Sequence, residues 1–234
     1  WRGSRRKEDG QMANPGAFRN ERSLHWDYFL SLEEDLLRSV RFVEPVEDNF
    51  VTYSTEFAGV ILGAASEVDV VLKGLCRKVN PQTKAYRITE YREELASCAR
   101  WDILVSKVSA PRWPDLSFDP WGSWRERGET PQWWKDYNKV KHQRDQHFSK
   151  ANLLNAWQAM SALFLSCIAY YRQIGATDIL PPSSCFAANR DIARVWLDEG
   201  MPTMCIDPQR IAVMDSRRSA TIRMGSYGEV LGKG

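Results

Sequence analysis

The sequence has no long hydrophobic run and no excess of charge of one sign. Its longest strongly apolar stretch, 160–171, is shorter than the roughly 20 residues that a membrane-spanning helix needs. Lysine and arginine number 32 against 30 aspartate and glutamate residues, which gives a net charge of +2. The sequence therefore predicts no membrane span, and its overall charge lacks the footprint of a strongly basic nucleic-acid-binding domain.

Paired cysteines and familiar catalytic motifs are missing as well. The five cysteines, which are odd in number and widely spaced, are Cys76, Cys98, Cys167, Cys185 and Cys205. This spacing suits neither a disulfide framework nor a zinc site, so we expect reduced thiols in a cytoplasmic protein without a secretory signal. Walker A, GxGxxG, HExxH and GxSxG motifs do not occur, and no metal or cofactor is predicted.

Helical periodicity is the main signal that is present. It predicts a mainly α fold, an antiparallel bundle of four to five long helices with a tryptophan-rich loop and an irregular C-terminal appendage. We expect a disordered segment at 1–22, the helical bundle at 23–175 and an appendage of uncertain order at 176–234. Met12 is a candidate initiator, which makes 1–11 a leader or an expression remnant.

Local signals mark the ends of the first two predicted helices. A capping box formed by Ser31 and Glu34 starts the first, which ends before Pro45. Ser54 or the next residue caps the second, whose apolar residues repeat at spacings of three and four up to Asn80. The second helix is the better marked of the two.

Three further helices are expected. One begins at Thr89 and ends near 101, and another starts at Thr130, which is followed by proline. Ser149 is expected to cap the last and most apolar helix, which ends at Gly175. The last two are predicted to be antiparallel neighbours that meet at a charged corner.

The segment 111–131, which has no helical period, is rich in tryptophan. The simplest prediction is a hydrophobic lid over the bundle, because indole rings bury a large area. The alternative is a stacking platform for bases or an exposed interface patch.

Two alternatives also remain for the polar residues of the second helix. Asp69 and Lys73 are spaced as an ion pair one turn apart, while Glu67 lies beside the apolar stripe. Glu67 is predicted either to be a carboxylate at the rim of the core or to reach Lys141 or His142.

Polar side chains gather between the last two predicted helices. They are Tyr137, Asn138, Lys139, Lys141, His142, Arg144, Asp145 and His147. Cations suit a phosphate group, and a histidine suits proton transfer near neutral pH. The alternative is a solvated polar corner without a ligand.

These features resemble the HEPN superfamily of helical domains, and an uncharacterised bacterial branch of it in particular. The resemblance is carried by Tyr-Ser-Thr-Glu-Phe at 53–57, by Glu67 with Lys73, and by Trp-Trp-Lys-Asp-Tyr-Asn-Lys-Val-Lys-His-Gln-Arg at 133–144. It covers roughly 24–174 and implies a helical module of a bacterial defence or toxin-type system.

In active HEPN members an arginine, a polar residue and a later histidine face their copies across a homodimer and cleave RNA without a metal. The resemblance implies that His142 is the general acid or base and that Asn138 holds its geometry, with Lys141 or Arg144 supplying positive charge. Tyr137 stands where the family has its arginine, and a tyrosine cannot supply a fixed positive fork. The resemblance therefore predicts a degenerate catalytic motif.

Two functions follow for the chain. The first is a non-catalytic HEPN-like interaction module whose corner binds an internal carboxylate or a partner, either RNA or protein, supported by Tyr137, Asn138, Glu67, Lys73 and Trp134. The alternative is a metal-independent ribonuclease that acts through His142 with Lys141 or Arg144. An open basic groove that spans a dimer would favour the ribonuclease, and a buried or salt-bridged cluster would favour the interaction module.

Overall fold

Three long helices form the body of the fold in the computed structural model, which describes residues 24–126, 128–175 and 183–188. The helices are α1 (Leu24–Val40), α2 (Thr55–Val79), α3 (Ile88–Leu95), α4 (Trp101–Leu104), α5 (Gly122–Glu126), α6 (Gln132–His147) and α7 (Leu153–Gln173), with 3-10 turns η2 (Glu47–Asn49) and η3 (Phe148–Lys150). The strands β1 (Val108–Ser109), β2 (Ser117–Phe118) and β3 (Ala187–Ala188) form a small antiparallel sheet in the order β2-β1-β3. The predicted mainly α bundle is confirmed.

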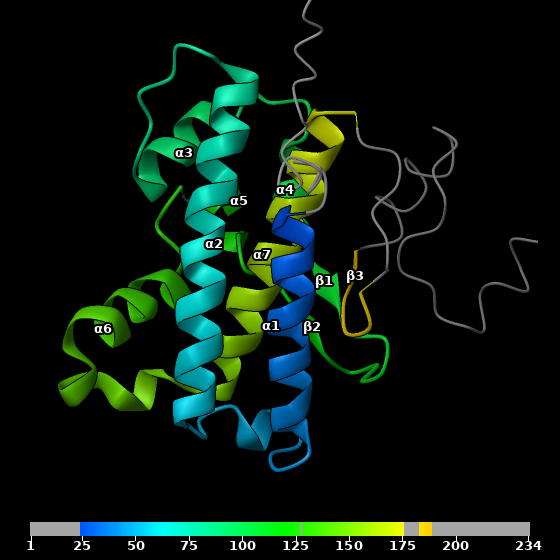
Figure 1. Cartoon of the computed structure of the whole chain (residues 1–234), viewed down its shortest axis with the longest axis vertical. Helices are drawn as coiled ribbons and strands as arrows, with labels where there is room; N and C mark the ends of the chain where they lie inside the picture. The colour runs from blue at the N-terminus through cyan, green and yellow to red at the C-terminus, as the bar shows by residue number, and fades with distance from the viewer. Residues whose placement is uncertain (1–23, 127, 176–182, 189–234) are drawn as a thin grey trace, which may run out of the picture.

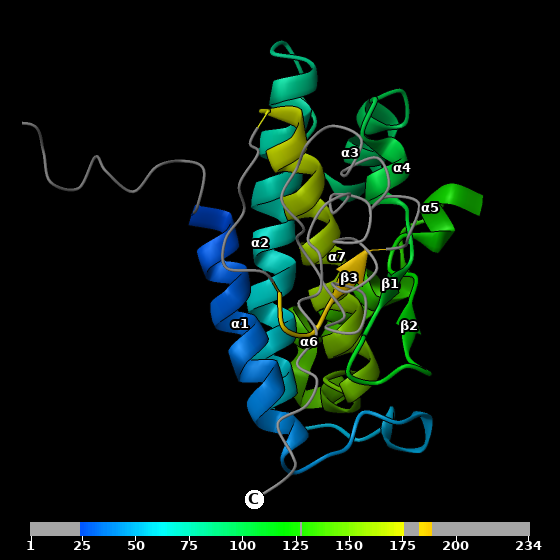
Figure 2. The ribbon, with the colours of Figure 1, turned by 90° about the vertical axis from the view of Figure 1, so that its right-hand side faces the viewer.

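Helix α7 lies at the centre of the fold. Figure 2 shows α1 and α2 on one side of it and β1, β2 and α5 on the other. Its length and composition would suit a membrane span, yet 89% of its most apolar window is buried inside the described fold. Such burial is typical of the core helix of a globular domain.

Helices α2 and α7 run in the same direction, and α1 runs antiparallel to both (Figure 1). At one end the backbone N–H of Leu153 donates to the carbonyl of Thr52 at 2.9 Å. Near the other end α2 passes so close to α7 that a Cβ on Gly74 would lie 3.1 Å from the ring of Tyr170. Glycine at this position therefore permits the close approach of the two helices.

The predicted bounds of α2 are confirmed, whereas the predicted start of α1 at Ser31 is wrong. The hydroxyl of Ser54 accepts from the N–H of Phe57 at 3.1 Å, as a capping residue does. Helix α1 begins at Leu24, and Ser31 is an exposed residue within it. The N–H of Trp26 in the first turn donates to the Tyr171 hydroxyl at 3.2 Å, so α7 supplies a partner for one N–H group of this turn.

The ends of the later helices also differ from the predicted ones by a few residues. Helix α6 begins at Gln132 with Pro131 before it, and Thr130 does not cap it. Asn152 caps α7 by accepting from the N–H of Asn155 at 3.0 Å, while Ser149 lies in η3. The predicted cap at Ser149 is therefore three residues too early.

The tryptophan-rich segment covers the bundle as the predicted lid. Trp121 and Trp124 are buried with ring centroids 4.3 Å apart, and the ring of Trp133 on α6 lies edge-on to that of Trp121 at 5.5 Å. The indole N–H of Trp133 donates to the carbonyl of Pro120 at 2.8 Å. Because the rings of Trp121 and Trp124 are buried, the alternative of a base-stacking platform is wrong for them.

Residues 183–188, which the sequence assigns to the appendage, pack against the bundle. Cys185 and Phe186 are buried, and Ala187 and Ala188 pair with β1. The rest of the predicted appendage and the predicted N-terminal segment 1–22 lie outside the described residues.

Candidate functional site

The polar residues nominated from the sequence lie at the C-terminal end of α6. Lys141, His142 and Arg144, here called the basic corner, are all exposed. The helix is kinked between them, because Gln143 has the non-helical angles φ −143° and ψ 44°. In Figure 1 this end of α6 projects from the side of the bundle.

The basic corner has almost no intramolecular partner. Among the described residues, no carboxylate lies within ion-pair distance of Lys141, His142 or Arg144. The ammonium group of Lys141 lies 5.5 Å from the ring centroid of Tyr137, a weak cation–π contact. The corner is therefore neither buried nor salt-bridged, and it binds no internal carboxylate of the described chain.

The supporting residues on α6 serve the helix and its packing. Trp134 and Tyr137 are buried, with ring centroids 5.2 Å apart. The side-chain amide of Asn138 donates to the carbonyl of Trp134 at 3.0 Å, one turn earlier in the same helix. No hydrogen bond joins Asn138 to His142 in the described structure, so the expected support of the histidine by Asn138 is not formed there.

Glu67 and Lys73 do not join the basic corner. Lys73 pairs with Asp69 at 3.6 Å, which confirms the predicted ion pair within α2. The carboxylate of Glu67 contacts Nδ1 of His25 on α1. The hypothesis that Glu67 reaches Lys141 or His142 is therefore wrong.

His25 and Glu67 form a polar pair that the sequence did not suggest. Both side chains are largely buried, and the His25 ring lies edge-on to Tyr170 with centroids 5.2 Å apart. Burial raises the pKa of the nearby Cys167 thiol well above its ordinary value, and the charge of Glu67 adds to the effect. A carboxylate can orient a histidine for proton transfer, but neither residue lines the surface hollow that the structure describes beside α3.

The apolar residues Trp26 and Phe29 extend the apolar stripe of α1 toward its N-terminus, next to His25. This spacing is the sequence signal that could have placed His25 in a helix. Its partner is 42 residues away in the sequence, so only the fold brings the two together.

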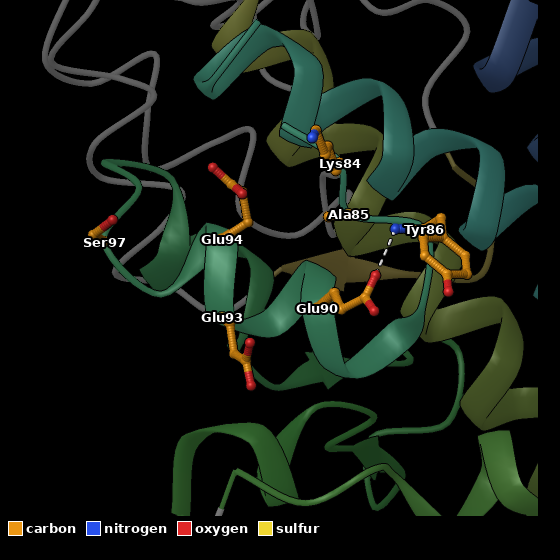
Figure 3. Close-up of a pocket in the computed structure, with 7 residues that line it drawn as sticks. All are labelled: Lys84, Ala85, Tyr86, Glu90, Glu93, Glu94 and Ser97. Atoms are coloured by element: carbon orange, nitrogen blue, oxygen red, sulfur yellow. Dashed lines mark hydrogen bonds between the residues drawn. The ribbon is translucent and has the colours of Figure 1, made fainter. Parts of the chain in front are cut away.

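A surface hollow beside α3 contains several carboxylates (Figure 3). Glu90 accepts from the N–H of Tyr86 at 2.9 Å, and Glu94 accepts from the side chains of Asn80 and Thr83 at 2.7 and 2.8 Å. These carboxylates hold the turn between α2 and α3. The hollow is open, and its polar groups do not converge on one point.

Within residues 24–126, 128–175 and 183–188, no group of three or more histidine, cysteine, aspartate or glutamate side chains is placed to hold a metal ion. Comparisons with protein-family models, with curated proteins and with solved structures gave no match. The candidate site therefore depends on its own geometry.

Proposed function

We propose that this chain is a non-catalytic HEPN-like interaction module of a bacterial defence or toxin-type system, which binds an anionic partner through the basic corner. The observation that carries the proposal is the exposure of Lys141, His142 and Arg144 without an ion-pair partner among the described residues. Such cations keep their capacity to bind phosphate or carboxylate oxygens. The resemblance favours RNA as the partner and a homodimer as the assembly.

The exposure of the corner is by itself the outcome expected of the ribonuclease, but two other features favour binding over catalysis. Tyr137, at the position where the resembled family has its catalytic arginine, is 5% exposed and packs against Trp134. His142 has no hydrogen-bond partner in the described structure that would fix its tautomer or its orientation. Catalytic histidines are usually held by such a partner, so the corner is better suited to binding than to proton transfer.

Fluorescence anisotropy with a labelled single-stranded RNA tests the proposal. The double variant Lys141→Ala/Arg144→Ala is expected to weaken binding, because it removes two cations that contact phosphates. Arg77→Ala/Lys84→Ala is the matched control, since it removes one arginine and one lysine that are exposed elsewhere. Equal losses in both variants, or no binding by the natural chain, would contradict binding of RNA at the corner.

A metal-independent ribonuclease is the second candidate. It is favoured by the position of His142 and Arg144 on either side of the kink at Gln143, where both are open to a substrate. Incubation of labelled RNA with the chain and a chelator tests it, with His142→Ala beside His147→Ala. Cleavage that only His142→Ala abolishes would replace the non-catalytic proposal, and the molar mass in solution would show whether the chain is a dimer.

A further inference from the structure

Glu33 is a buried carboxylate that is held by one short segment. It is 3% exposed and lies on α1. Its oxygens accept hydrogen bonds from the hydroxyls of Ser183 and Ser184 and from the backbone N–H groups of Ser184 and Cys185, the last two at 3.1 and 3.0 Å. All of these donors belong to residues 183–188, here called the strap.

The strap also fills an apolar pocket and extends the sheet. The ring of Phe186 lies 5.4 to 6.0 Å from those of Trp157, Phe164 and Phe29, measured between centroids. Ala187 pairs with Ser109 of β1, whose hydroxyl donates to the Ala187 carbonyl at 3.3 Å. Glu33, this pocket and the edge of β1, here called the groove, together form the surface that the strap occupies.

A fixed acceptor, a pocket for one side chain and a free strand edge are the three features with which proteins recognise extended peptides. We propose that this groove is a recognition site for a linear peptide of the pattern hydroxyl residue, hydroxyl residue, any residue, phenylalanine. The strap is its occupant within the same chain and can be released. This inference is independent of the function proposed for the basic corner.

Aromatic contacts between α1 and α7 also exist apart from the strap. Phe29 of α1 meets Phe164 of α7 directly, with centroids 5.7 Å apart, and Trp26 meets Phe164 at 6.0 Å. The free energy gained from the hydrogen bonds to Glu33 is offset by the cost of removing its carboxylate from water. The carboxylate regains its hydration when the strap leaves, so this cost is then recovered. Tethering favours the occupant from the same chain, so a free peptide competes only when the strap is weakened.

The thiol of Cys185 reports release of the strap. It is fully buried, and burial raises its pKa above the ordinary value, so it reacts slowly with N-ethylmaleimide while the strap is bound. Cys76 and Cys167, which are buried in α2 and α7, report opening of the bundle itself. Mass spectrometry of the labelled full chain separates the sites.

We expect Cys185 to react at least about tenfold faster than Cys76 and Cys167, because release of a short segment requires less than opening of the bundle. Glu33→Gln should raise the rate at Cys185 by about tenfold or more, since it weakens hydrogen bonds to a charged acceptor. Glu34→Gln, an exposed neighbour on the same helix, should leave the rate unchanged.

A peptide in trans tests recognition itself. The probe has the sequence of residues 183–188 with Cys185→Ser and blocked ends. In the Ser184→Ala chain, whose strap is weakened while its groove is intact, millimolar probe should accelerate labelling of Cys185, and in Glu33→Gln it should not. Equal labelling rates of Cys185, Cys76 and Cys167 in every chain would overturn the proposal. A labelling rate of Cys185 in Ser184→Ala that does not change with added probe would also overturn it.

Discussion

The two parts of helix α6 contrast sharply although they are continuous in the sequence. In the part that precedes the kink, Trp133, Asp136 and Tyr137 are buried. Asp136 accepts from Gln132 at 3.0 Å and from Asn155 at 3.4 Å, so its carboxylate joins α6 to α7. In the C-terminal part, 141–146, which contains the kink at Gln143, every residue is exposed.

The contrast teaches that polar residues in one motif can serve different ends. Asp136 is satisfied by the fold, and so it is not available to a ligand. Lys141 and Arg144 lack any such partner among the described residues and gain most from an external anion. The motif therefore divides into a structural portion and a binding portion, and the following variants test that division.

Trp133→Ala is expected to have the largest effect on stability. The ring is buried between Trp121 and Trp134, and its removal should lower the free energy of unfolding by roughly 3–5 kcal/mol through lost burial and a cavity. Urea unfolding measures the change. Lys135→Ala, an exposed neighbour on the same helix, is the control and should unfold like the natural chain.

Tyr137→Arg restores the arginine of the resembled family and should still be destabilising. A guanidinium at this buried position lacks a carboxylate partner and displaces the ring that packs on Trp134, which costs about 2 kcal/mol or more. We also expect no RNA cleavage from the variant in the presence of a chelator. A stable variant that cuts RNA would show that position 137 belongs to the binding portion.

Asp136→Ala should have an intermediate effect. It removes the acceptor of the Gln132 amide and one of the two acceptors of the Asn155 amide, which keeps its bond to the Lys150 carbonyl, and the free energy of unfolding should fall by about 1–2 kcal/mol. Asp145→Ala is the matched control, because it removes a carboxylate from the exposed part of the same helix. Equal losses in the two variants, measured by urea unfolding, would remove the distinction between the two parts.

Those features of the fold that have local causes could be predicted from the sequence. The ends of α2 depend on the hydroxyl of Ser54 and on Pro81, which act within one turn. The partner of Trp26 in the first turn of α1 could not be predicted, because the accepting hydroxyl of Tyr171 is 145 residues away in the sequence. The contact between Glu33 and the strap spans a similar separation and has no local signal.

The candidate site was predictable only in part. The sequence indicated a cluster of cations next to the most apolar helix, and the structure shows these cations together on one exposed end of α6. Lys141 and His142 precede the change of backbone direction at Gln143, and the ammonium group of Lys141 lies over the Tyr137 ring, so only Arg144 of the three cations lies beyond the kink. Position 143 is a glutamine, and neither a proline nor a glycine stands there to indicate a kink. The sequence therefore predicted one continuous helical motif.

The double variant Lys141→Ala/Arg144→Ala should have the smallest effect on stability and a clear effect on binding. Neither side chain has an ion pair to lose in the described structure, so urea unfolding should match that of the natural chain. With a single-stranded RNA, the slope of log affinity against log salt concentration should become shallower by about 0.7 for each cation removed. The control Arg77→Ala/Lys84→Ala keeps the slope if those cations lie outside the contact. A loss of stability with an unchanged slope would instead place Lys141 and Arg144 in the structural portion of α6, because cations that bind phosphates change the salt dependence and cations that only support the fold do not.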